Sequence, residues 1–80
     1  MKQQEIRNNL LKIIDENGIT VLENGDLTNM DSLQFVSSLV SIEEYFKIEF
    51  PDEFLSLENQ YNLDTISGVV YELLQENNSN

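Results

Sequence analysis

The chain is best understood from residues 31–51, which read DSLQFVSSLVSIEEYFKIEFP. Apolar side chains recur here at the spacing of an amphipathic helix and form two neighbouring ridges, Phe35, Leu39, Ile42 and Phe46 in one and Leu33, Val36 and Val40 in the other. Asp31 with Gln34 three residues later has the pattern of a capping box. Pro51 cannot continue a helix and disfavours helical backbone just before it. We therefore predict a helix over residues 32–47, with Asp31 or Ser32 as its N-cap.

Helices are also predicted on both sides of this stretch. Residues 2–16 carry one apolar stripe at helical spacing, formed by Ile6, Leu10, Ile13 and Ile14. Asn17-Gly18 suits the end of that helix, because glycine accepts the left-handed backbone that follows many helices. The same dipeptide could open a β-hairpin, but neither side offers a strand of adequate length, so we favour the helix cap.

The last helix is predicted to begin at Asp64, which is a good N-cap residue. Its apolar positions repeat at helical spacing and comprise Ile66, Val69, Val70, Leu73 and Leu74. Gly68 lies inside this helix, where it costs about 1 kcal/mol relative to alanine. A glycine retained at that cost indicates close packing against another helix.

Two connections complete the chain. Residues 17–31 form a long loop with a turn at residues 24–26, and a loop of this length inside a compact domain is often functional. A short turn of helix is predicted over residues 57–61. The 80 residues allow one small core. We assign residues 1–76 to a single all-α domain of three longer helices and one short helix, and residues 77–80 to a frayed polar tail.

The composition excludes several classes of function. The chain has 15 acidic and 4 basic residues, no histidine and no cysteine, and its formal net charge is -11. Without cysteine and histidine, the chain lacks the usual zinc ligands and the nucleophile or base of Cys- or His-dependent catalysis. Residues 15–18 superficially resemble a calcium-binding loop, but they lack the acidic ligands at alternate positions that such a loop needs. Because a surface this acidic repels phosphate backbones and anionic lipids, we expect neither nucleic acid nor a membrane as a partner. We expect a cytoplasmic protein that docks on basic surfaces and is not an enzyme.

One short motif has a chemical use: Asp31-Ser32-Leu33, at the junction of the long loop and the second helix. Read alone, it is a helix cap. A serine in the first turn of a helix, however, points its hydroxyl outward, where the helix dipole favours an attached phosphate. Ser32 is therefore a candidate attachment point for a phosphodiester-linked group.

The residues around this motif resemble an acyl carrier protein. The likeness rests on residues 30–36, MDSLQFV, and residues 39–53, LVSIEEYFKIEFPDE. In that family an Asp-Ser-Leu triplet opens the second helix, the helix ends in acids and phenylalanine, and an Ile-x-hydrophobic-Pro-Asp-Glu stretch follows. The rest of the chain agrees in outline through its length, acidity, long first loop, short third helix and final helix near Thr65-Ile66.

The resemblance implies a four-helix bundle whose motif serine, Ser32, carries 4'-phosphopantetheine, with Asp31 and Leu33 flanking it. A separate phosphopantetheinyl transferase would attach this cofactor, whose thiol holds acyl or aminoacyl groups as thioesters. The pathway would be of fatty-acid, polyketide or nonribosomal-peptide type, and the carrier is expected to be a monomer.

The resemblance also implies that loading and condensing enzymes contact the second helix, through Leu33, Val40, Glu43 and Glu44. For Leu33 and Val40 packing into the core is an equal alternative, and for the two glutamates a solvated face is the alternative. Ser37, Ser38 and Ser41 share the polar remainder of this helix. A different function also stays open: an acidic helical interaction module that uses its surface directly and is never modified.

Overall fold

The computed structural model describes residues 2–28, 30–55 and 61–77, and this part of the chain is mostly helical. Three helices, α1 (Gln3–Glu16), α2 (Ser32–Phe46) and α3 (Leu63–Asn77), match the three longer helices predicted. Between α1 and α2 lie two short antiparallel strands, β1 (Thr20–Val21) and β2 (Leu27–Thr28), and a 3-10 helix, η1 (Asp52–Leu55), follows α2. No described helix is long and apolar enough to cross a membrane.

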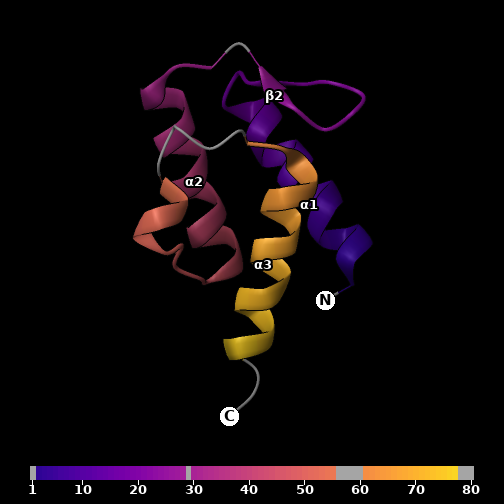
Figure 1. The fold of residues 1–80 in the computed structure, drawn as a ribbon, viewed down its shortest axis with the longest axis vertical. Helices are drawn as coiled ribbons and strands as arrows, with labels where there is room; N and C mark the ends of the chain where they lie inside the picture. Colours follow the sequence, from indigo (N-terminus) through magenta and orange to yellow (C-terminus); the bar gives the residue numbers. More distant parts are fainter. Residues whose placement is uncertain (1, 29, 56–60, 78–80) are drawn as a thin grey trace.

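The helices α2 and α3 run in the same direction, and α1 runs opposite to both (Figure 1). The first residues of α2 and α3 therefore lie at one end of the molecule, the end that also carries the β-hairpin and the last residues of α1. Because both N-termini lie at this end, the positive ends of two helix dipoles lie there as well. This end contains the motif at residues 31–33.

Helix α1 follows the prediction closely. It buries Ile6, Leu10 and Ile14 against the other helices. Asn17 then closes the helix by donating its backbone N–H to the carbonyls of Ile13 and Ile14, and Gly18 follows with φ of +81°. The prediction that Asn17-Gly18 caps the helix is confirmed.

The hairpin was not part of the all-α prediction. Its strands pair Thr20 with Thr28 and Val21 with Leu27. The predicted turn at residues 24–26 is confirmed, since the backbone N–H of Asp26 donates to Oδ1 of Asn24 at 3.0 Å. Strands of two residues have no periodicity that a sequence pattern could reveal, which explains why the loop prediction missed them.

Two predictions about the last helix are wrong. Helix α3 begins at Leu63, and its cap is Asn62, whose Oδ1 accepts the backbone N–H of Asp64 at 2.8 Å. Asp64 is the second residue of α3 and so is not its N-cap; its carboxylate forms an ion pair with Arg7 of α1. Gly68 is exposed, and a Cβ at that position would meet no heavy atom within 4 Å, so it marks no close helix packing.

The remaining boundary predictions meet the structure only in part. Residues 57–60 of the predicted short helix lie outside the described residues, whereas Tyr61 is described and is not helical. The 3-10 helix η1 occupies the preceding residues, directly after Pro51. Asn77 still belongs to α3, so the predicted frayed tail begins too early, and residues 78–80 lie outside the described residues.

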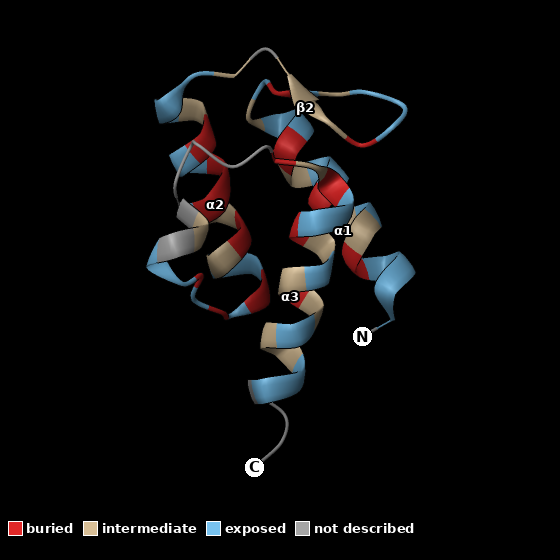
Figure 2. Ribbon diagram, viewed as in Figure 1, coloured by how far each residue is buried: buried red, intermediate tan, exposed pale blue. Residues whose placement is uncertain are grey.

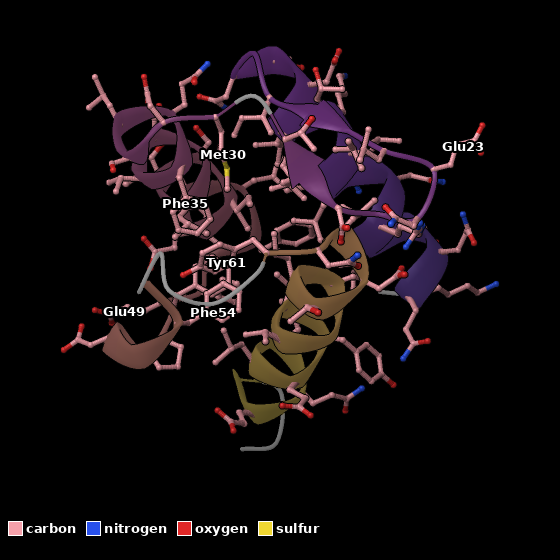
Figure 3. All side chains as sticks on the ribbon, turned by 45° about the horizontal axis from the view of Figure 1, so that its top comes forward. Glu23, Met30, Phe35, Glu49, Phe54 and Tyr61 are labelled. Carbon is pink, nitrogen blue, oxygen red and sulfur yellow. The ribbon has the colours of Figure 1, made fainter. Side chains whose placement is uncertain are left out.

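The core lies on the facing sides of the three helices (Figure 2). The ridge predicted for α2 is buried, with Phe35 1% and Leu39 2% exposed. Aromatic rings extend the core toward η1: the ring centroids of Phe35 and Tyr61 are 4.0 Å apart, and those of Tyr61 and Phe54 are 5.6 Å apart. Figure 3 shows these rings following one another below Met30. The aromatic cluster thus fixes α2 to the segment that precedes α3.

Candidate functional site

The first turn of α2 is closed by a complete capping box. Oδ1 of Asp31 accepts the backbone N–H of Gln34 at 2.8 Å, and Oε1 of Gln34 accepts the backbone N–H of Asp31 at 3.1 Å. Asp31 is extended, with φ of -103° and ψ of 178°, as an N-cap residue must be. The predicted box is confirmed, and Asp31, not Ser32, is the cap.

Ser32 is the first residue of α2 and is exposed. Because Asp31 performs the capping, the Ser32 hydroxyl is not needed for it, and this hydroxyl forms no hydrogen bond with any residue the structure describes. The exposed first turn is visible at the upper left of Figure 2. The hydroxyl is therefore accessible at the positive end of a helix, where a phosphate ester is favoured.

An apolar stripe runs along the outer face of α2 from this point. Leu33 is 79% exposed, Val36 51% and Val40 46%, and their spacing places them on one side of the helix. The alternative that Leu33 and Val40 pack in the core is therefore wrong. Val36 belongs to the same stripe, although the prediction of partner contacts left it out; its place in the second apolar ridge of the sequence was the available signal.

The two glutamates of α2 have different roles. Oε2 of Glu43 accepts the backbone N–H of Phe50 at 2.8 Å, which ties the end of α2 to the segment before Pro51. Glu44 is exposed. Glu43 is half-buried and engaged within the chain, so Glu44 is the freer of the two for a partner.

The three serines of α2 do not form a solvent-facing polar strip. Ser38 is only 2% exposed, and its hydroxyl has no hydrogen-bond partner in the part of the chain that the structure describes. The Ser37 hydroxyl donates to Oδ1 of Asn17 at 3.0 Å, and the Ser41 hydroxyl donates to the backbone carbonyl of Ser37 at 3.1 Å. Of the three, only Ser38 is buried; Ser37 is exposed and its bond to Asn17 reaches the end of α1, whereas the bond of Ser41 stays within α2.

Hollows in the described surface lie elsewhere. One, of about 270 Å³, is polar and lies between α1 and α3 beside Arg7 and Asp64. Another, of about 460 Å³, lies between α1 and β1, where Leu11, Ile19 and Val21 contribute to its walls. Neither is lined by a residue of α2. The described residues also contain no cluster of acidic side chains that could hold a metal ion.

The structure thus brings together the predicted site residues Asp31, Ser32 and Leu33 at one exposed helix start, with Val40 and Glu44 further along the same helix. Comparison with known proteins adds no relative, because no protein-family model, characterised protein or solved structure matches the chain significantly. Function is therefore inferred from the residues and geometry of this chain.

Proposed function

We propose that the chain is an acyl carrier protein that holds acyl or aminoacyl intermediates on a 4'-phosphopantetheine arm attached to Ser32. In the attachment step, Oγ of Ser32 attacks the β-phosphate of coenzyme A, a phosphodiester forms, and 3',5'-ADP leaves. The serine proton goes to a base of the transferase. The biosynthetic pathway would be of fatty-acid, polyketide or nonribosomal-peptide type.

The observation that carries this proposal is the exposed Ser32 hydroxyl beside a cap that does not use it. Asp31 satisfies the amide of Gln34 by itself, so Ser32 is free to react without loss of the helix start. Esterification places phosphate at the N-terminus of α2, where the helix dipole lowers its energy. A serine that served only as the cap would have its hydroxyl occupied.

The composition of the chain agrees with a carrier protein that supplies no reactive group of its own. A carrier protein positions its cargo, and the cofactor supplies the thiol that forms the thioester. This chain has no cysteine and no histidine of its own, so the reactive sulfur would come from the arm. Helices α1, α2 and α3 would supply three members of the four-helix bundle, and the short third helix, predicted over residues 57–61, falls mostly outside the described residues.

Partner enzymes would dock on the apolar stripe of α2. Leu33 lies next to the arm and is the most exposed large apolar side chain of α2, and Val36 and Val40 continue the contact. Glu44 adds a negative charge beside the stripe, and the net charge of -11 favours partners with basic surfaces. The transferase and the loading and condensing enzymes would share this surface.

Coexpression with a broad-specificity phosphopantetheinyl transferase, followed by intact mass spectrometry, tests the proposal. We expect the wild-type chain to gain one phosphopantetheinyl group and Ser32→Ala to gain none. The matched control is Ser41→Ala in the same helix, which removes the hydroxyl that donates to the Ser37 carbonyl and should be labelled like wild type. Ser32→Ala should change the free energy of unfolding by less than about 0.5 kcal/mol, because its hydroxyl makes no described hydrogen bond.

An unlabelled wild-type chain would contradict the proposal and favour the unmodified acidic interaction module. That alternative has one observation behind it, the net charge of -11 spread over a small chain. Labelling of Ser32→Ala would also contradict the proposal, because the arm would then be attached elsewhere.

A further inference from the structure

Asn17, Gln34 and Ser37 form a polar clamp between the end of α1 and the first turns of α2. The backbone carbonyl of Asn17 accepts a hydrogen bond from Nε2 of Gln34 at 3.4 Å, and its Oδ1 accepts one from the Ser37 hydroxyl at 3.0 Å. Nδ2 of Asn17 donates to the carbonyl of Ile13 at 2.8 Å, which holds the Asn17 side chain on α1. Both helices are therefore fastened at the end of the molecule that carries Ser32.

Gly18 provides the space in which the clamp closes. Its φ of +81° is a left-handed conformation that side chains with a Cβ rarely adopt. A Cβ at this position would lie 3.2 Å from Nε2 of Gln34. The glycine that follows the C-cap of α1 thus also lets the Gln34 amide reach the Asn17 carbonyl.

Gln34 connects the clamp directly to the turn that presents Ser32. One end of its amide, Oε1, accepts the backbone N–H of Asp31, and the other end, Nε2, donates to Asn17. The residue before Ser32 is therefore linked to α1 through a single side chain. This link sets the orientation of the first turn of α2 relative to the rest of the bundle.

We propose that Asn17, Gln34 and Ser37 are positioning residues for the modification of Ser32, an inference that rests on the proposed carrier function. A transferase must engage the outer face of α2 and reach the Ser32 hydroxyl at once. When the first turn moves relative to α1, only a fraction of the molecules presents the outer face of α2 and the Ser32 hydroxyl together. The apparent affinity for the transferase is then the intrinsic affinity multiplied by that fraction. The clamp therefore acts on the KM for the carrier and not on kcat.

Two variants separate the clamp from the capping box. Gln34→Glu keeps an oxygen for the Asp31 N–H, because glutamate is a normal partner in a capping box, but it loses the Nε2 donor to Asn17. Ser37→Ala removes the other clamp bond without adding a charge. The matched control is Gln4→Glu on α1: it introduces the same charge and removes a similar exposed bond, from Nε2 of Gln4 to Oδ1 of Asn8, far from Ser32.

Steady-state transfer from coenzyme A by a broad-specificity transferase is measured for the full chain and the three variants. Gln34→Glu and Ser37→Ala should each raise the KM for the carrier about three- to tenfold at unchanged kcat, the size expected for losing one such hydrogen bond. Gln4→Glu should match wild type. Amide hydrogen exchange at Gln34 and Phe35 should be faster in the clamp variants alone, as a readout independent of the transferase.

Particular outcomes would overturn the inference. A wild-type KM in Ser37→Ala, or a fall in kcat at constant KM, shows that the clamp does not position Ser32. These results differ from failure of the carrier function, in which the wild-type chain itself accepts no arm. If the wild-type chain is modified and the clamp variants show its KM, only the clamp is rejected.

Discussion

Helices α2 and α3 begin at the same end of the molecule, and each begins with a side-chain cap, but the two starts differ in what covers them. At α3 the hairpin bonds to Asn62 and Leu63, while Asp64 and Thr65 are exposed: the Gly25 carbonyl accepts the N–H of Leu63 at 2.7 Å, and Nδ2 of Asn62 donates to the Asn24 carbonyl and to Oδ1 of Asp26. At α2 the capping box joins Asp31 and Gln34, Gln34 also donates to the Asn17 carbonyl, and Ser32 stays exposed.

The difference shows that a cap determines where a helix begins but not whether that helix start can bind anything. Both starts have the dipole and the amide groups that favour a phosphate. At the start of α3 the backbone N–H of Leu63 donates to the hairpin, and the Asp64 carboxylate forms an ion pair with Arg7 of α1. The start of α2 has a free serine hydroxyl instead, so of the two it is the one suited to a covalent group.

The largest expected effect on stability comes from Gly25→Ala, which disturbs the contact between the hairpin and the start of α3. Gly25 is buried with φ of +93°, and a Cβ there would lie 2.8 Å from Oδ1 of Asn62. Strain and steric conflict together should lower the free energy of unfolding by about 2–4 kcal/mol in urea denaturation. Gly68→Ala is the control: its Cβ meets nothing within 4 Å, and it should stabilise the chain by about 0.5–1 kcal/mol. Equal effects of the two substitutions would break the comparison.

The two helix caps should contribute different amounts to the free energy of unfolding. Asn62→Ala removes the cap of α3 and both bonds to the hairpin, so we expect a loss of about 2 kcal/mol, whereas Asp31→Ala should cost about 1 kcal/mol. Asn62→Ser retains a capping oxygen but not the amide donors, and should fall between wild type and Asn62→Ala. If Asp31→Ala proved the more destabilising in chemical denaturation, the start of α3 would not be the more strongly held one.

A smaller effect concerns Tyr61, directly before the cap of α3. Burial raises the pKa of the Tyr61 phenol above its ordinary value of 10.0, and the phenol donates a hydrogen bond to the Phe54 carbonyl at 2.6 Å. Because the folded state favours the protonated phenol, its contribution to stability is complete below pH 10 and is lost as the pH rises through the higher folded-state value.

Tyr61→Phe tests this effect in thermal unfolding. The variant should lose about 1 kcal/mol at neutral pH, because the bond to Phe54 is gone. The difference in the free energy of unfolding between wild type and Tyr61→Phe should then narrow as the pH rises above 10. If this difference stays constant or widens above pH 10, ionisation of the Tyr61 phenol does not lower the stability of the fold.

Sequence reasoning was most successful where a local pattern repeats. The period of Phe35 and Leu39 gave their burial, and the spacing of Asp31 and Gln34 gave the capping box. It failed where two local signals compete: Asn62 and Asp64 are both good cap residues, and in the structure Asn62 caps α3 while Asp64 lies in its first turn and pairs with Arg7. The exposed hydroxyl of Ser32 was predicted, whereas its attachment to α1 through Asn17 was not, since no local pattern links residues so far apart in sequence.

Amphipathic periodicity and short-range capping chemistry were enough to establish from the amino acids alone that three helices form, that one begins at Ser32, and that the surface is acidic. Packing between distant segments determined the rest. The hairpin docks on the start of α3 and leaves the start of α2 open, Ser38 is buried, and Leu33 is exposed. The reason is physical: the energy of a helix turn depends on residues three or four positions away, whereas exposure depends on every segment that folds against that turn.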